Sequence, residues 1–196
     1  HWIYERLETK MNRNCSANAS YISYLAKADT KLYGIAVVTT DGKIFKAGDA
    51  DYLFPVESIA KVFTLAHVLK TQGYEALQKK IGVNATGLPF NSALAIELNN
   101  DKLTGSPPPG NPLVNAGAIA AVSLVEGDTP DAKWEALFNT ASAFAGHKLT
   151  LNKDVYNSEM ADNEHNLAIA VLLRSYNYLY ADPAETIDVY TRECSY

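Results

Sequence analysis

Ser58 and Lys61 are the residues of this chain whose types and spacing could carry out chemistry. They lie three positions apart in Ser58-Ile59-Ala60-Lys61, so a helix would place the hydroxyl and the amine on one face, one turn apart. A serine hydroxyl is a poor nucleophile at neutral pH, but a lysine whose pKa is lowered by burial or nearby positive charge can accept its proton. The N-terminus of a helix supplies positive potential, which would also stabilise a developing oxyanion. The pair therefore predicts covalent catalysis by a serine with a lysine base.

The spacing alone is weak support for this chemistry, because a chain of this length contains S-x-x-K roughly once by chance. The related form T-x-x-K begins at Thr40 and again at Thr150, and the first of these lies in an expected turn. The surrounding sequence must therefore separate a catalytic pair from a coincidence.

A β-hairpin is expected upstream of the pair. Leu32–Thr40 is rich in apolar and β-branched residues, and Lys43–Ala47 is extended again. The dipeptide Asp41-Gly42 between them accepts positive φ angles, as a tight hairpin turn requires.

The pair itself falls on an expected helix. Apolar residues recur at helical spacing across Glu57–Lys70, and Gly73 ends the pattern. Ser58 lies in the first turn of this helix, where the positive potential is strongest.

The rest of the chain is expected to consist mainly of helices joined by loops. Thr86–Gly110 is mainly loop, with a short helical segment near Ser92–Leu98. Three longer helices are expected after it, namely a buried one over Asn115–Val125, one from Thr129-Pro130 to Gly146, and one over Asn163–Tyr180 that Asp182-Pro183 breaks.

Composition and charge exclude several classes of function. A formal charge of -5 and a pI near 5.4 give no reason to bind nucleic acid or an anionic membrane surface. The longest apolar stretches are too short to span a bilayer, and the first residues lack the pattern of a secretory signal. The two cysteines form no disulfide framework and suit a reducing cytoplasm, so a cytoplasmic protein is expected. Residues 1–20 are polar and weakly patterned, which predicts a leading helix or a loose arm.

No cofactor or metal is expected. The four histidines are scattered, the two cysteines are far apart, and the sequence has no His-Glu-x-x-His motif. No Gly-x-Gly-x-x-Gly or phosphate-binding loop occurs either.

Several sequence blocks surround the serine and lysine in a fixed order. They are Gly34–Val38, Ala47–Asp49, Phe54–Val62, Thr86–Ser92, Asn111–Ile119, Ser158-Glu159, Asn166–Ala170 and Tyr190–Ser195. In this order and spacing they resemble the serine-dependent glutaminases, whose catalytic domain resembles the serine β-lactamases. The resemblance extends from about Tyr21 to the last residue, which predicts one domain over 21–196. It implies an α/β fold of the α+β type, with helices packed on a mainly antiparallel sheet.

The resemblance implies a role for individual residues. Ser58 would attack the side-chain amide of L-glutamine with Lys61 as base, and water would then release L-glutamate from the acyl-enzyme. The residues implied to line the substrate site are Tyr21, Ser58, Asn115, Glu159, Asn166 and Tyr190.

Ordinary structural roles are the alternative for these residues. Asn115 and Asn166 could each cap a helix, and Glu159 could be a solvated surface side chain. Tyr190 could serve in core packing. Ser23 stands where the family normally has proline, so the loop after Tyr21 is expected to be less rigid.

The resemblance also leaves rival functions open. Family members continue beyond the Cys-Ser segment with a second site tyrosine, a Lys-Ser-Gly motif and an oxyanion-hole N–H. This chain alone is therefore expected to be poorly active unless another chain supplies those strands.

One alternative function is a catalytically impaired fragment that acts as a binding or scaffold protein. Another is a β-lactamase or penicillin-binding relative, which needs Ser-Asp-Asn and Lys-Thr-Gly motifs that this sequence lacks. The family usually forms homo-oligomers, so a homo-oligomer is expected.

Overall fold

The computed structural model describes residues 17–99 and 105–196. The chain divides into two compact units between Phe54 and Pro55. The expected arm over residues 1–20 lies almost entirely outside the described residues, so its boundary stays a prediction.

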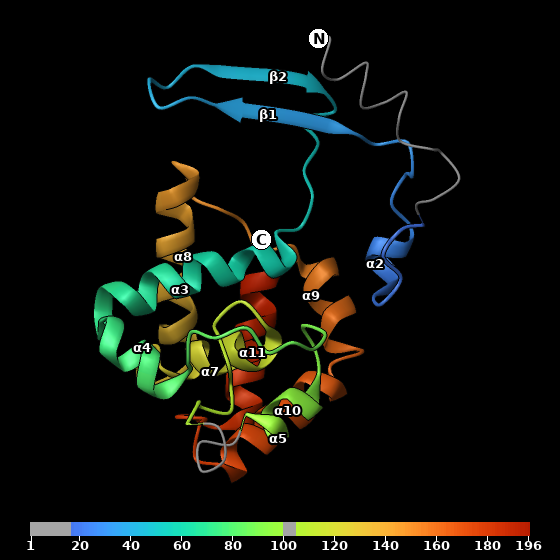
Figure 1. Ribbon diagram of the computed structural model, residues 1–196. Coiled ribbons are helices and arrows are strands. Elements are labelled where there is room, and N and C mark those ends of the chain that lie inside the picture. The colour runs from blue at the N-terminus through green and yellow to red at the C-terminus, as the bar shows by residue number, and fades with distance from the viewer. Residues whose placement is uncertain (1–16, 100–104) are drawn as a thin grey trace. The chain divides into compact units, whose positions relative to one another are not determined.

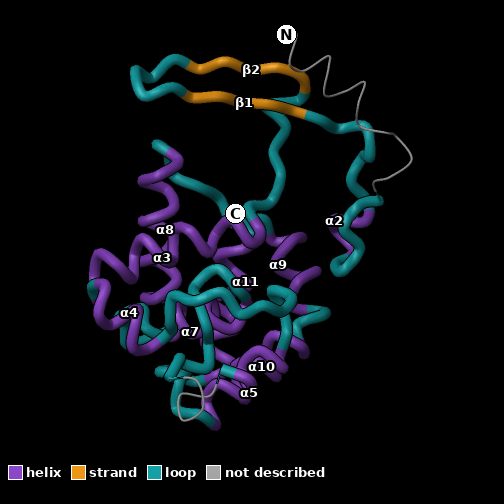
Figure 2. The backbone as a smooth tube through the Cα atoms, viewed as in Figure 1, coloured by secondary structure: helices purple, strands orange, loops and turns teal. Residues whose placement is uncertain are grey.

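The first unit contains one β-hairpin. A short helix, α2 (Ser23–Ala26), precedes β1 (Gly34–Val38) and β2 (Ile44–Gly48), which lie side by side as antiparallel strands (Figures 1 and 2). Gly42 has a φ of 81° in the turn between the strands, a conformation that glycine adopts without a steric cost. The hairpin predicted from the sequence is confirmed.

The second unit is helical. Its elements are η1 (Glu57–Ile59), α3 (Ala60–Gln72), α4 (Tyr74–Lys80), α5 (Ala93–Leu98), α7 (Asn115–Ser123), α8 (Pro130–Ala145), α9 (Lys153–Met160), α10 (Glu164–Ser175) and α11 (Pro183–Cys194). Helix α11 runs through the middle of this unit and contacts η1, α7, α8, α9 and α10 (Figure 1). Helix α3 packs on α7 and α8. No helix in the described ranges is long and apolar enough to cross a bilayer.

Helix α7 forms the centre of the core, as its apolar sequence predicted. All of its residues are buried, including those near its ends. Its small side chains let the backbone of other segments come close. At Gly117 a Cβ atom would lie only 1.7 Å from the carbonyl oxygen of Asn111, so no larger residue fits there without a shift of the backbone.

Helix α8 begins and ends where the sequence predicted. The Thr129 side chain accepts a hydrogen bond from the backbone N–H of Ala132 at 3.2 Å, and Pro130 occupies the first turn. Gly146 closes the helix with a φ of 73°.

The predicted helix over Asn163–Tyr180 is too long. Helix α10 ends at Ser175, because Asn177 takes a left-handed conformation with a φ of 64° and turns the chain. Asp182 begins the next helix instead of only ending this one: its carboxylate accepts hydrogen bonds from the first turn of α11. The apolar pattern of the sequence continues past Ser175, so it gave no sign that the helix ends there.

Candidate active site

The serine and lysine of the S-x-x-K motif lie together where a helix begins. Ser58 is in the single 3₁₀ turn η1, which leads directly into α3, and Lys61 is the second residue of α3. The Lys61 Nζ donates a hydrogen bond to the Ser58 Oγ over 2.6 Å. Ser58 is exposed, whereas Lys61 is only 4% exposed. A reachable hydroxyl is thus joined to a buried amine.

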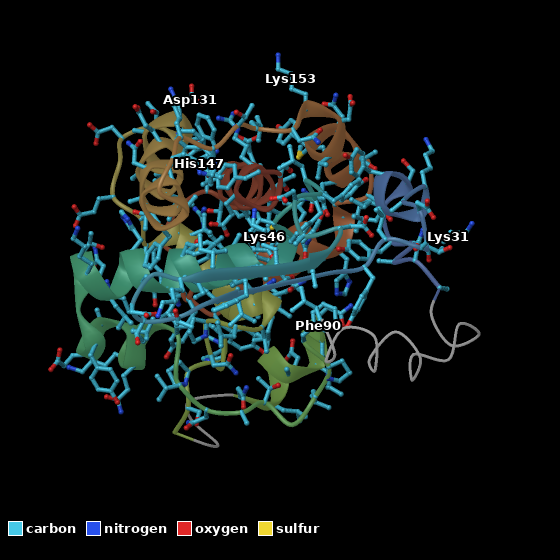
Figure 3. The ribbon with its side chains drawn as sticks, turned by 90° about the horizontal axis from the view of Figure 1, so that it is seen from above. Lys31, Lys46, Phe90, Asp131, His147 and Lys153 are labelled. Carbon is cyan, nitrogen blue, oxygen red and sulfur yellow. The ribbon has the colours of Figure 1, made fainter. Side chains whose placement is uncertain are left out.

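The two T-x-x-K segments have no such geometry. Lys43 is exposed in the hairpin turn and forms an ion pair with Asp41 over 2.6 Å. Lys153 is exposed at the start of α9, where its side chain projects away from the helix (Figure 3). Burial of the lysine therefore distinguishes the Ser58 segment from the other two.

The surroundings of Lys61 favour its neutral, proton-accepting form. Burial lowers the pKa of the Lys61 amine, because the charged form loses its hydration. Four nearby acidic groups act in the opposite direction, and these are Cys194, Glu193, Glu57 and Glu159. Burial outweighs them, so the site is suited to a lysine base.

A chain of polar side chains extends from the ring beside Lys61. The Lys61 Nζ lies 5.5 Å from the ring centroid of Tyr190, whose hydroxyl is 3.5 Å from the Asn115 Oδ1, a long hydrogen bond. The Asn115 Nδ2 donates to the Asn166 Oδ1 over 3.2 Å, and the Asn166 Nδ2 donates to the Asn163 Oδ1 over 3.3 Å. Tyr190 thus links the lysine to the two asparagines.

The capping roles considered for the two asparagines are wrong. Val114 is the N-cap of α7, so Asn115 is already inside the helix. Asn166 is the third residue of α10. Their amides meet each other instead of the backbone at a helix end, which leaves a pair of polar groups beside the tyrosine.

Glu159 is half-buried and forms a carboxyl pair with Glu57. A side-chain hydrogen bond joins the two residues. Burial raises the pKa of Glu159 to about 8, and Glu57 adds to the increase, while Lys61 opposes it. The predicted alternative of a solvated surface glutamate does not fit this environment.

Sequence reasoning missed Glu57 as a member of this cluster. Its position directly before Ser58 was the available signal, since the two residues share one turn. Its φ of 47° is rare for a residue other than glycine and marks an unusual bend before the serine.

The second unit brings together six of the seven residues singled out from the sequence, and these are Ser58, Lys61, Asn115, Glu159, Asn166 and Tyr190. Tyr190 also belongs to the apolar core, as its alternative role suggested. Tyr21 belongs to the first unit, where it is exposed just before α2, and its place in the site stays a prediction. Within the described ranges, no cluster of three or more His, Cys, Asp and Glu side chains could hold a metal ion.

A helical body, a small antiparallel sheet and an S-x-x-K pair at the start of a helix define a protein of the β-lactamase-like fold. The chain belongs to the glutaminase family, whose model matches residues 17–196.

Curated relatives with similar sequences are named glutaminases. A glutaminase from Brucella canis is 51% identical over 178 residues, which is 91% of this chain and 54% of the relative. A glutaminase from Mycobacterium ulcerans is 46% identical over 193 residues, which is 98% of this chain and 58% of the relative. The chain thus spans about half the length of the curated relatives it matches.

Solved structures of glutaminases superpose on this chain. The structure of a probable glutaminase, YbaS, superposes with a TM-score of 0.88 at 44% identity, covering 97% of this chain and 60% of that one. The Bacillus subtilis glutaminase YbgJ, solved as a covalent complex with 5-oxo-L-norleucine, superposes with a TM-score of 0.80 at 26% identity. That match covers 99% of this chain and 57% of the other.

Proposed function

We propose that this chain carries the catalytic pair of a glutaminase, which hydrolyses L-glutamine to L-glutamate and ammonia through an acyl-enzyme on Ser58. The observation that carries the proposal is the 2.6 Å hydrogen bond between the exposed Ser58 hydroxyl and the buried Lys61 amine. Membership of the glutaminase family supplies the substrate class.

The chemistry begins with transfer of the Ser58 hydroxyl proton to the Lys61 Nζ. The Ser58 Oγ then forms a bond to the carbon of the glutamine side-chain amide. When the carbon–nitrogen bond breaks, the proton passes from Lys61 to the leaving nitrogen, so ammonia departs. Water, deprotonated by Lys61, hydrolyses the remaining ester, which releases glutamate and restores the serine.

The polar groups near the pair suit the two charges of a free amino acid. The Glu159 carboxylate can accept hydrogen bonds from the α-ammonium group of glutamine, and its charge neutralises that group. The amides of Asn115 and Asn166 can donate to the α-carboxylate. The Tyr190 hydroxyl lies between the asparagines and Lys61, where it can orient the substrate relative to the base.

The direct test is an assay of ammonia release from L-glutamine by the purified chain and by Ser58→Ala. The proposal predicts turnover by the unchanged chain, slow as expected for this chain alone, and none above background for Ser58→Ala. Ser175→Ala is a matched control, because Ser175 is an exposed serine at the end of α10. Glutamine turnover that survives Ser58→Ala would contradict the acyl-enzyme.

A cytoplasmic location, assembly as a homo-oligomer and the absence of a cofactor belong to the same proposal. They rest on the family and on the composition of the chain.

A further inference from the structure

A buried carboxyl group acts electrostatically on the lysine of the S-x-x-K pair. Glu193, on α11, is only 2% exposed. Thr64 is one turn after Lys61 on α3 and is 1% exposed. The Thr64 hydroxyl donates a short hydrogen bond to the Glu193 Oε2, which fastens α11 to α3.

The second oxygen of this carboxyl group has no hydrogen-bond donor among the described residues. The Glu193 Oε1 is buried as deeply as the rest of the side chain. A buried polar atom without a partner is costly, and a buried negative charge persists only beside a positive one. A carboxyl group at this position therefore needs a reason beyond packing.

The cation that acts on this group is Lys61. Its charge and the Thr64 hydrogen bond lower the pKa of Glu193, while burial raises it to about 8. In turn, the Glu193 charge raises the pKa of Lys61. The two groups are therefore coupled: whichever of them holds a charge stabilises the opposite charge on the other.

We propose that Glu193 is a positioning residue for catalysis, whose buried carboxylate, held by Thr64, balances the positive charge that Lys61 gains when it takes the proton from Ser58. The inference rests on the proposed role of Lys61 as base. It assigns to α11 a second task besides core packing, which is to keep the lysine within a narrow range of basicity. A base of this kind works best when its pKa lies near the working pH.

Besides Glu193, other titratable groups face the lysine from the elements packed against it. They are Glu57 from η1, Glu159 from α9, and Tyr190 and Cys194 from α11. Glu57 and Glu159 share a hydrogen bond with each other. Burial raises the pKa values of Tyr190 and Cys194 well above their usual range, so both stay neutral near neutral pH. Glu193 differs from all of these because its charge is tied to α3 by Thr64.

The test is the pH dependence of kcat/KM for glutamine in Glu193→Gln. The amide keeps the shape of the side chain and can still accept from Thr64, but it carries no charge. Without that negative charge, the pKa of Lys61 falls, so the acidic limb of kcat/KM moves to lower pH by on the order of one unit. The proton-transfer step loses its counter-charge, so kcat falls about tenfold or more while KM changes little.

Two further variants make the result specific. Glu185→Gln removes an exposed glutamate from the same helix and leaves the profile unchanged. Thr64→Val keeps the carboxyl group but removes its donor, which raises the pKa of Glu193. The acidic limb then moves in the same direction by a smaller amount, and this variant replaces Glu193→Gln if that protein does not fold.

An acidic limb that stays in place in both Glu193→Gln and Thr64→Val would overturn the inference, because a purely structural role predicts lower stability without a change in the profile. The proposed function is judged separately, by glutamine turnover in the unchanged chain. If that turnover is absent, the catalytic role of Lys61 fails first. If turnover is present and the limb does not move, only the role of Glu193 fails.

Discussion

At the scale of single residues, the proposed chemistry depends on the hydrogen bond between the Lys61 Nζ and the Ser58 Oγ. Neither residue type is rare, and two further threonine–lysine pairs share the spacing. What sets Lys61 apart is burial, which lowers its pKa and allows it to accept a proton. Burial was not visible in the motif itself, because it is produced by helices that lie far away in the sequence.

The Lys61 amine is expected to be essential for turnover. In Lys61→Met, which preserves the length and apolar stem of the side chain, ammonia release should fall by about two to four powers of ten, as expected for loss of a general base. The matched control is Lys153→Met, since Lys153 is exposed in the equivalent position of a T-x-x-K segment. Equal losses of ammonia release in the two variants would mean that removing any lysine charge lowers the activity, and that Lys61 has no specific role as a base.

The pKa of Glu159 predicts how glutamine binding depends on pH. The ammonium group of glutamine binds the carboxylate form of Glu159, and with a pKa of about 8 that form is scarce in acid. The apparent KM should therefore fall by about fiftyfold as the pH rises from about 6 to about 8, because the fraction of enzyme with an ionised Glu159 rises by that factor. In Glu159→Gln the KM should be higher and largely independent of pH over that range. A KM in the natural sequence that does not change with pH would contradict this assignment.

At the scale of elements, the site depends on how closely α7 can approach its neighbours. Gly117→Ala should destabilise the protein by about 3 kcal/mol, because the added methyl group would overlap the backbone of Asn111. Gly146→Ala is the comparison, since its Cβ would enter open space and only the left-handed φ of 73° is unfavourable. That change should cost about 1 kcal/mol. Chemical denaturation of both variants measures the difference, and a Gly117→Ala protein as stable as Gly146→Ala would show that the loop can move aside.

Elements whose ends have a recognisable turn or cap residue could be predicted from the sequence. Elements that depend mainly on packing against distant segments were harder to predict. The hairpin at Asp41-Gly42 and the capped ends of α8 were found because each end has a residue with a local mechanism. Helix α9 was missed because Val155 is its only buried residue in the described structure, so it has little apolar periodicity. Its available signal was Asn152, whose side chain accepts hydrogen bonds from the backbone N–H groups of Asp154 and Val155 in the first turn of the helix.

The same distinction applies to the site. The resemblance to the family predicts Asn115, Asn166 and Glu159 as substrate ligands, although their local sequence suggested caps and a surface residue. In the structure Asn115 bonds to Asn166, and Glu159 pairs with Glu57. The involvement of Glu193 could not be predicted, because a glutamate in a sequence gives no sign of being buried, and the only signal for Glu57 was its position directly before Ser58. Only the packing of η1, α9 and α11 around Lys61 brings these carboxyl groups together.

At the scale of the whole molecule, the fold and family are established and the activity is the proposal. Binding of glutamine can be separated from its hydrolysis with Ser58→Ala, which keeps the other proposed substrate ligands. Glutamine at about a hundred times its Kd should stabilise this variant by about 2.7 kcal/mol, seen as a higher Tm. Stabilisation of the natural chain without turnover would instead favour the binding or scaffold function.

The β-lactamase alternative is tested on the same protein with a chromogenic cephalosporin. The chain should not hydrolyse it, because the Lys-Thr-Gly motif that such enzymes need is absent from the sequence. Hydrolysis of the cephalosporin without turnover of glutamine would favour the β-lactamase function over the glutaminase function.

The Ser58 nucleophile is tested directly by covalent labelling with 6-diazo-5-oxo-L-norleucine, the compound that reacted with the Bacillus subtilis relative. The experiment measures the intact mass of the treated protein and locates the adduct by peptide mapping, with Ser58→Ala and Lys61→Met in parallel. A Ser58 nucleophile activated by Lys61 predicts one adduct per chain, on Ser58, which is absent from Ser58→Ala and forms much more slowly in Lys61→Met. An unlabelled natural chain, or an adduct on another residue, would contradict it.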